Sequence, residues 1–130
     1  MKVIKGHELH LSAPDQVGLL ASVAGRCRDA GINILGISAY RREGTAWFVL
    51  HTDNPFRAAE VLSDMHVIWQ EVLVIDCPSG VGTLAGIAEK LAAAGINILY
   101  CYGTVSDAPL AKIVMDTSHN DRALEVLTRG

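Results

Sequence analysis

Two segments with the same pattern carry the residues best suited to bind a small ligand. In each, a proline is followed by a short turn with a glycine, Gly18 or Gly82, and then by an apolar run with helical spacing. A helix that begins after such a turn presents unpaired backbone N–H groups, and its dipole adds partial positive charge there. Glycine also lets a ligand approach the backbone closely. These loops therefore predict binding of a carboxylate.

An asparagine follows at the same spacing in both segments. Asn33 and Asn97 lie after the predicted helices and begin the next extended segment. A carboxamide donates and accepts hydrogen bonds, so it can bind both the ammonium and the carboxylate of an amino acid. The sequence Gly-x-Asn after a helix is also ordinary turn chemistry, so a purely structural role for these residues stays open.

Other reactive residues do not match the spacing of catalytic or metal sites. The sequence has no Gly-x-Ser-x-Gly, no phosphate-binding loop, no HxxxH and no HExxH. We therefore predict no catalysis, no cofactor and no metal. His10 and His51, on neighbouring predicted strands, leave a metal-responsive regulator open as an alternative. The three cysteines contain no CxxC and lie in apolar stretches, which predicts small buried thiols: Cys27, Cys77 and Cys101.

Composition narrows the classes of partner. The formal net charge is −3 and aromatic residues make up 5%, which disfavours binding to nucleic acid. No apolar segment follows the N-terminal methionine, so no signal peptide is expected. The longest aliphatic run, Val72–Ile75, is far shorter than a membrane span. We expect a cytoplasmic protein without membrane contact.

The ligand loops belong to a longer internal repeat. Residues 14–35 align with residues 78–99 at a constant offset of 64, and about half of the paired positions are identical. A second match, residues 57–62 with residues 122–127, has an offset of 65. Repeats of this length indicate two copies of one small module.

The hydrophobic pattern predicts the elements of each module. Alternation predicts strands, and apolar residues at helical spacing predict helices, with an Arg41–Gly44 hairpin turn and Asp15 placed to cap the first helix. The order is strand, helix, strand, strand, helix, strand, the ferredoxin-like βαββαβ unit. The expected strands are 8–13, 32–40, 46–51, 67–69, 72–76, 96–105 and 111–115. The expected helices are about 19–30, one that begins at 53, 81–94 and about 122–127, and a turn is expected at 106–109.

We therefore predict an α+β protein with two ferredoxin-like βαββαβ units in tandem, antiparallel sheets and helices on one face. The first domain is expected over residues 1–70 and the second over residues 71–130. The second copy ends after its last helix, so its fourth strand is missing. We expect Lys2–Lys5 or a partner chain to cover the open edge.

The repeated motif resembles the signature of ACT domains, small ferredoxin-like modules that regulate amino-acid metabolism. The resemblance rests on Val-Gly-x-Leu-Ala followed by Ala-Gly-Ile-Asn-Ile in both copies, and it covers nearly the whole chain as a tandem pair. It implies that an amino acid binds at an interface between ACT units, held by the strand-to-helix loop and the following strand. The residues implied are Asp15, Gln16, Val17, Gly18, Leu19 and Asn33 in the first copy, and Ser79, Gly80, Val81, Gly82 and Asn97 in the second.

The copies differ at positions that matter for binding. Many amino-acid binders have asparagine three residues before the loop glycine, whereas this chain has Asp15 and Ser79. The residue after the asparagine-containing motif is Gly36 in one copy and Tyr100 in the other. We expect that one site dominates.

The leading hypothesis is a non-catalytic, allosteric regulatory module, a homodimer, that binds an amino acid or a related carboxylate. A second hypothesis is an interaction module that docks on a metabolic enzyme without a ligand. The metal-responsive regulator is the third.

Overall fold

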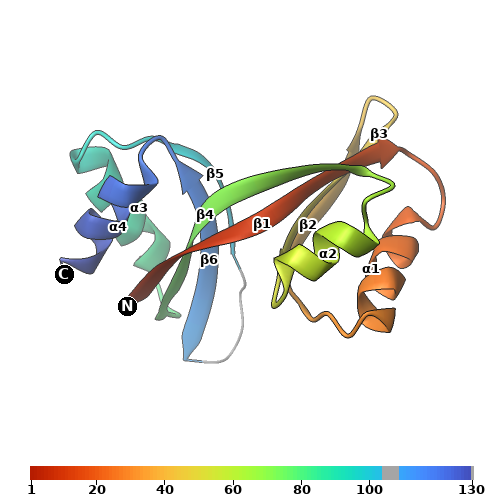
Figure 1. The fold of residues 1–130 in the computed structure, drawn as a ribbon. Coiled ribbons are helices and arrows are strands. Elements are labelled where there is room, and N and C mark those ends of the chain that lie inside the picture. The colour runs from red at the N-terminus through yellow and green to blue at the C-terminus, as the bar shows by residue number, and fades with distance from the viewer. Residues whose placement is uncertain (104–108, 130) are drawn as a thin grey trace. The chain divides into compact units, whose positions relative to one another are not determined.

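The structure is a computed structural model, and it describes residues 1–103 and 109–129. Within that part of the chain, six antiparallel strands and four helices form an α+β fold (Figure 1). The chain divides into two compact units. The first unit is His7–Gln70, and the second unit combines Met1–Gly6 with Glu71–Gly130. The expected turn at 106–109 and the end of the 96–105 strand lie mostly outside the described residues.

The first unit has the predicted order of elements. Its strands follow the order β2-β3-β1-β4. Leu9, Leu11 and Phe48 of the sheet are buried in the core. Helices α1 and α2 cover one face of this sheet (Figure 1). The elements are β1 (Lys2–Pro14, of which residues 7–14 belong here), α1 (Leu19–Asp29), β2 (Ile34–Arg42), β3 (Thr45–Thr52), α2 (Pro55–Val61) and β4 (His66–Pro78, here to residue 70).

The second unit repeats this arrangement, with strand order β1-β4-β6-β5. Its core contains Leu73, Ile75 and Met115 from the sheet and Leu91 and Leu127 from the helices. The elements are β1 (residues 2–6), β4 (residues 71–78), α3 (Thr83–Ala93), β5 (Ile98–Gly103), β6 (Leu110–Thr117) and α4 (Asn120–Thr128).

Strands β1 and β4 each contribute to both units. The separately expected strands at 67–69 and 72–76 are one continuous strand, β4, and β1 starts at Lys2 rather than near Glu8. Val3 is buried in the second core, beside Leu73 and Ile75. Residues before His7 therefore complete the four-stranded sheet of the second unit.

Helix α3 begins later than the sequence suggested, whereas α1 begins where it was expected. Gly18 and Gly82 have φ of 85° and 84°, the left-handed conformation, so α1 begins at Leu19 and α3 at Thr83 rather than at residue 81. The expected cap by Asp15 was wrong. Its carboxylate accepts from Arg41 instead, with 3.0 Å between Oδ2 and Nε.

Candidate functional site

The first ligand loop forms one wall of a cavity of about 310 Å³ in the first unit. The wall consists of residues from the loop and the start of α1, and the ends of β2 and β3 form the other side. The Asp15–Arg41 ion pair lies at this cavity. The predicted site residues that line the cavity are Asp15, Gln16, Gly18 and Leu19.

The second ligand loop lines a cavity of about 350 Å³ in the second unit. Ser79 and Gly80 are the predicted site residues in its wall. Thr83 and Leu84 contribute from the first turn of α3, and the remaining lining comes from β4, β5 and β6. Both copies of the repeat therefore place a pocket between the helix start and the sheet.

The first turns of α1 and α3 line these pockets. The N–H groups of Leu19 and Thr83 already donate to the carbonyls of Gln16 and Gly80, at 3.4 Å each. In the part of the chain that the structure describes, neither helix has a side-chain hydrogen bond at its cap or an acidic residue in its first turn. The carbonyls of Gly18 and Gly82 accept the first intrahelical bonds, from Ser22 and Gly86. The N–H groups of the first turn therefore form the positive end of a helix dipole that no acidic residue of the same turn offsets, which favours a bound carboxylate.

The valines of both loops do not line the cavities. Val17 and Val81 are fully exposed at the loop tips. Gly82 is also absent from the described cavity wall, although the helix it caps contributes two residues. Loop residues therefore fall into two groups, those at the cavity and those facing solvent.

The structure does not bring the asparagines together with the loops of their own unit. At one end of β3, Thr52 pairs with Ile34 of β2. At the other end of β3, Thr45 pairs with Arg42 of β2 and with Pro14 of β1, which leads into the first loop. Asn33 precedes Ile34 and is thus at the end of the sheet away from the first loop. The second unit is the same, because Ile98 pairs with Thr117 and Pro78 with Leu110.

Both asparagines have a structural role through their backbone. The N–H of Asn33 donates to Asp53 Oδ1 at 3.0 Å, and its carbonyl accepts from the Asp53 N–H at 3.1 Å. Asn97 makes the equivalent pair with Ser118, with distances of 3.0 Å to Oγ and 2.8 Å from the Ser118 nitrogen. The carboxamides lie on exposed residues, which leaves them available to a neighbouring molecule.

The strand ends also contribute to the cavities. Tyr40 and Arg41 of β2 line the first cavity, which the motif did not indicate. Cys101 and Tyr102 of β5 line the second, directly after the Tyr100 position at which the sequence distinguishes the two copies. The pairing of these strands could have suggested them, since the hairpin returns next to the loop.

The three cysteines differ in exposure. Cys27 and Cys77 are buried, and burial raises the pKa of both thiols. The expectation of burial was wrong for Cys101, which is exposed. Cys101 lies on β5, which is the last strand of the sheet. β5 pairs with β6 on one side, and no described strand of the second unit covers its other side.

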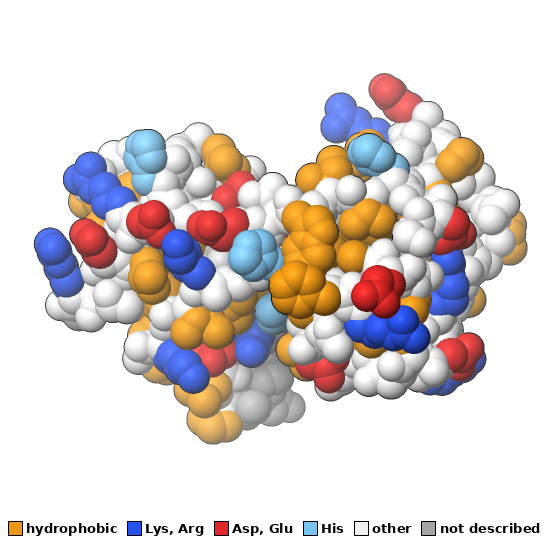
Figure 2. Space-filling model, viewed as in Figure 1, with side chains coloured by type: hydrophobic (Ala, Val, Ile, Leu, Met, Phe, Trp, Pro, Cys, Tyr) orange, Lys and Arg blue, Asp and Glu red, His pale blue; other side chains and the backbone are white. Residues whose placement is uncertain are grey.

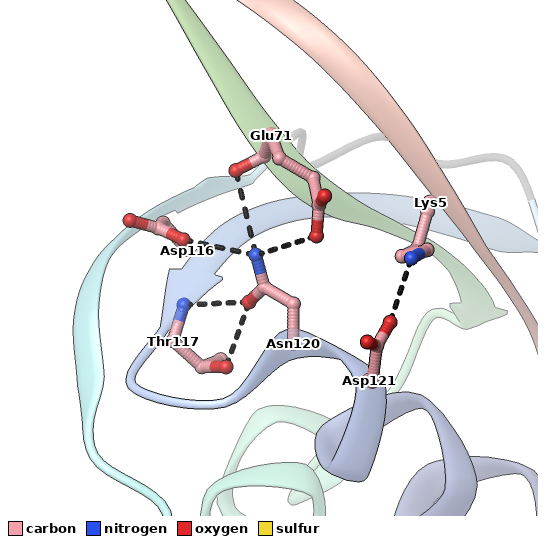
Figure 3. A network of polar contacts seen from close by, with 6 residues as sticks. All are labelled: Lys5, Glu71, Asp116, Thr117, Asn120 and Asp121. Atoms are coloured by element: carbon pink, nitrogen blue, oxygen red, sulfur yellow. Dashed lines mark hydrogen bonds and ion pairs between the residues drawn. The ribbon is translucent and has the colours of Figure 1, made fainter.

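A polar network joins β4, β6 and α4 in the second unit (Figure 3). The Asn120 amide donates to Asp116 Oδ1 at 3.0 Å and more weakly to Glu71, and its carbonyl oxygen accepts from the Thr117 nitrogen and hydroxyl at 2.9 and 2.7 Å. The amide is satisfied on both sides, which indicates a structural joint. Among the described residues, no group of three or more His, Cys, Asp or Glu side chains is placed to hold a metal ion.

Exposed aromatic side chains distinguish the first unit. Figure 2 shows hydrophobic side chains gathered around α2. Phe56 is 72% exposed and Trp69 is 42% exposed, and their ring centroids are 5.1 Å apart. His7 meets the Trp69 ring edge-on at 6.0 Å. Over residues 1–103 and 109–129, no helix is both long enough and apolar enough to cross a membrane.

The described geometry defines a ferredoxin-like α+β module with a pocket at the start of the first helix of each unit. Residues 7–70 match the family model of the ACT domain, and this match coincides with the first unit. No curated protein matches the chain.

Solved structures share the fold over nearly the whole chain. A protein from Bacteroides thetaiotaomicron is 24% identical with a TM-score of 0.90, covering 98% of this chain and 89% of that one. The structure of aspartokinase alpha and beta subunits gives 20% identity and a TM-score of 0.68, and the match covers 99% of this chain and 96% of that one. The regulatory subunit of aspartate kinase from Thermus thermophilus is 17% identical with a TM-score of 0.68, and the match covers 99% of this chain and 97% of that one. The chain thus resembles regulatory subunits in fold.

Proposed function

We propose that this chain is a non-catalytic regulatory module made of two tandem ACT domains, which binds an amino acid or a related carboxylate. The observation that carries the proposal is the repeated pocket at an uncapped helix start. The carboxylate of the ligand accepts from the first-turn N–H groups, and the pocket receives the side chain. The second unit is included because it repeats the motif, the fold and the pocket of the first.

A second copy of the chain supplies the asparagines in this proposal. β2 and β5 are edge strands. They and the adjoining helix faces expose apolar residues at equivalent positions, Leu20 and Leu35 in the first unit and Leu84 and Leu99 in the second. Such edges favour pairing with another chain.

Antiparallel pairing of an edge strand with its copy about a two-fold axis would place opposite ends of the strands side by side. Asn33 of one copy would then lie near the Asp15–Gly18 loop of the other. We propose a homodimer with its ligand at this interface, so that ligand binding favours one packing of the ACT units over another.

The test is calorimetry and thermal shift of the purified protein against the twenty standard amino acids. At least one is expected to raise the melting temperature and to give saturable heat, and Asn33→Ala or Asn97→Ala is expected to weaken that response. A folded dimer that responds to none of them would contradict the proposal.

The exposed Phe56–Trp69 pair favours a second candidate, a module that docks on a metabolic enzyme without a ligand. Exposed, clustered aromatic residues are enriched at protein interfaces. In that case Phe56→Ala should abolish capture of the partner, while Asn33→Ala should leave capture intact.

A further inference from the structure

Seven positions of the repeat line both pockets, and at five of them the second unit has the smaller side chain. Leu20 corresponds to Leu84, and Ala46 corresponds to Ala111. At five further positions the second unit has the smaller residue: Ser79 for Asp15, Gly80 for Gln16, Thr83 for Leu19, Gly103 for Ala39 and Ile113 for Phe48. At the positions that line both pockets, the side chains therefore take up less space in the second unit, whose cavity is about 350 Å³ against about 310 Å³ in the first.

The pockets also differ in charge. In the first, the Arg41 guanidinium and the Asp15 carboxylate form an ion pair at the cavity. A bound carboxylate would lie near the Asp15 charge, and a bound ammonium near the Arg41 charge. In the second, none of the described lining residues is acidic or basic. A zwitterion enters the second pocket without competing with an existing ion pair.

The floor of the second pocket is apolar. Cys77, Ala111 and Ile113 form it, and Cys77 and Ile113 are also part of the second core. Because burial raises the pKa of Cys77, its side chain remains a neutral thiol at neutral pH. A charged ligand side chain here would lose its hydration and find no countercharge among the described lining residues. A cavity of about 350 Å³ is also near the lower limit of small-molecule sites, about 300 Å³.

We propose that the pocket of the second unit is the principal ligand site, and that it selects amino acids with small, uncharged, apolar side chains. Alanine, valine, leucine and methionine fit this description, whereas aspartate, glutamate, lysine and arginine are rejected. The inference rests on the proposed function, because it assigns the ligand class of the same kind of site.

Cys101 provides a reporter for this pocket. It lines the cavity and is exposed, whereas Cys27 and Cys77 are buried. N-ethylmaleimide should therefore label Cys101 first. A ligand that occupies the pocket should slow this labelling, and mass spectrometry measures the rate. Cys101→Ala should remove the fast phase of labelling.

The experiment measures heat of binding and Cys101 labelling together, with four apolar and four charged amino acids. Binding and at least a threefold slower labelling are expected from one or more of the apolar set and from none of the charged set. Ser79→Asp places a carboxylate at the pocket and should weaken binding about tenfold or more. Ser63→Asp adds the same charge at an exposed position of the first unit and should change nothing.

The outcomes separate this inference from the proposed function. Charged amino acids that bind and protect Cys101 as well as apolar ones would overturn the inference and leave the proposed function standing. Heat of binding without protection of Cys101 would also overturn it, since the ligand would then bind elsewhere. No heat from any of the eight amino acids would overturn the inference, and no heat from the remaining twelve standard amino acids as well would overturn the proposed function too.

Discussion

Lys5 Nζ lies 2.6 Å from Asp121 Oδ1, which joins β1 to the start of α4 within the second unit (Figure 3). The first unit has an aromatic contact at the equivalent place. Phe56 occupies the repeat position of Asp121 and packs against Trp69, with ring centroids 5.1 Å apart. The two units therefore attach the fourth strand to the second helix by different chemistry, one ionic and one apolar.

The Lys5–Asp121 pair predicts a loss of stability in alkali. Its hydrogen bond to Asp121, followed by the attraction of the same carboxylate, raises the pKa of Lys5 above 10.5. The stabilisation is thus fully present below pH 10.5 and is lost as the pH rises through the folded-state pKa. Urea midpoints of the wild type and Lys5→Met should differ slightly at pH 8, and the difference should disappear at higher pH. A difference that stays unchanged after Lys5 has lost its proton would contradict this explanation.

Val3 predicts that the N-terminal residues are part of the second core. Val3 is 8% exposed and packs in that core, while its neighbour Ile4 is 49% exposed. Val3→Ala should lower the free energy of unfolding by about 1–3 kcal/mol, because buried methyl groups are lost and a cavity remains. Ile4→Ala is the matched control and should have a much smaller effect in the same urea titration. Equal effects would show that residues 2–5 do not pack as described.

Gly82 and Gly86 predict opposite effects of the same substitution. Gly82 has φ of 84°, so alanine there should destabilise by about 1–2 kcal/mol through strain, although a Cβ would meet no described atom within 4 Å. Gly86 lies inside α3, and a Cβ there would also meet no described atom within 4 Å. Gly86→Ala should therefore stabilise by about 0.5–1 kcal/mol. Thermal unfolding measures both, and a shift in the same direction for both would refute this explanation.

The repeat also predicts a stabilising substitution at the start of α4. Asn54 caps α2 by accepting from the Arg57 N–H at 3.1 Å, whereas His119, at the equivalent position of α4, makes no side-chain cap bond within the described chain. The backbone angles agree, φ −144° and ψ 81° for Asn54 against −151° and 84° for His119. His119→Asn should therefore stabilise, and Asn54→Ala should destabilise, each by about 1 kcal/mol. Urea titration of both variants tests this; no gain from His119→Asn would contradict it.

Much of the fold could be predicted from the sequence because local rules and the repeat agreed. The hairpin at Glu43 and Gly44 is confirmed, with φ of 51° and 81° at the two turn residues. The order of elements is confirmed in both units. The sequence analysis predicted two strands where the structure has one, β4. The polar pair Gln70 and Glu71 interrupts the apolar pattern and so suggested a break, but no turn residue lies between the two runs.

The site was harder to predict because its residues meet only through the fold. The motif suggests that Gly18 and Asn33 act together, but an 11-residue helix lies between them and separates their ends by about 16 Å. Cys101 lies in an apolar run, yet it is exposed because β5 is an edge strand. A strand's place in its sheet depends on pairing, which the local pattern does not encode.

Isothermal titration calorimetry of the wild-type protein with the standard amino acids tests the proposed binding role most directly. Saturable heat is expected from at least one amino acid with a small apolar side chain, and this heat should be lost in Ser79→Asp while circular dichroism shows an unchanged fold. A folded protein that gives no saturable heat with any standard amino acid would contradict the claim that this chain is an amino-acid-binding regulatory module.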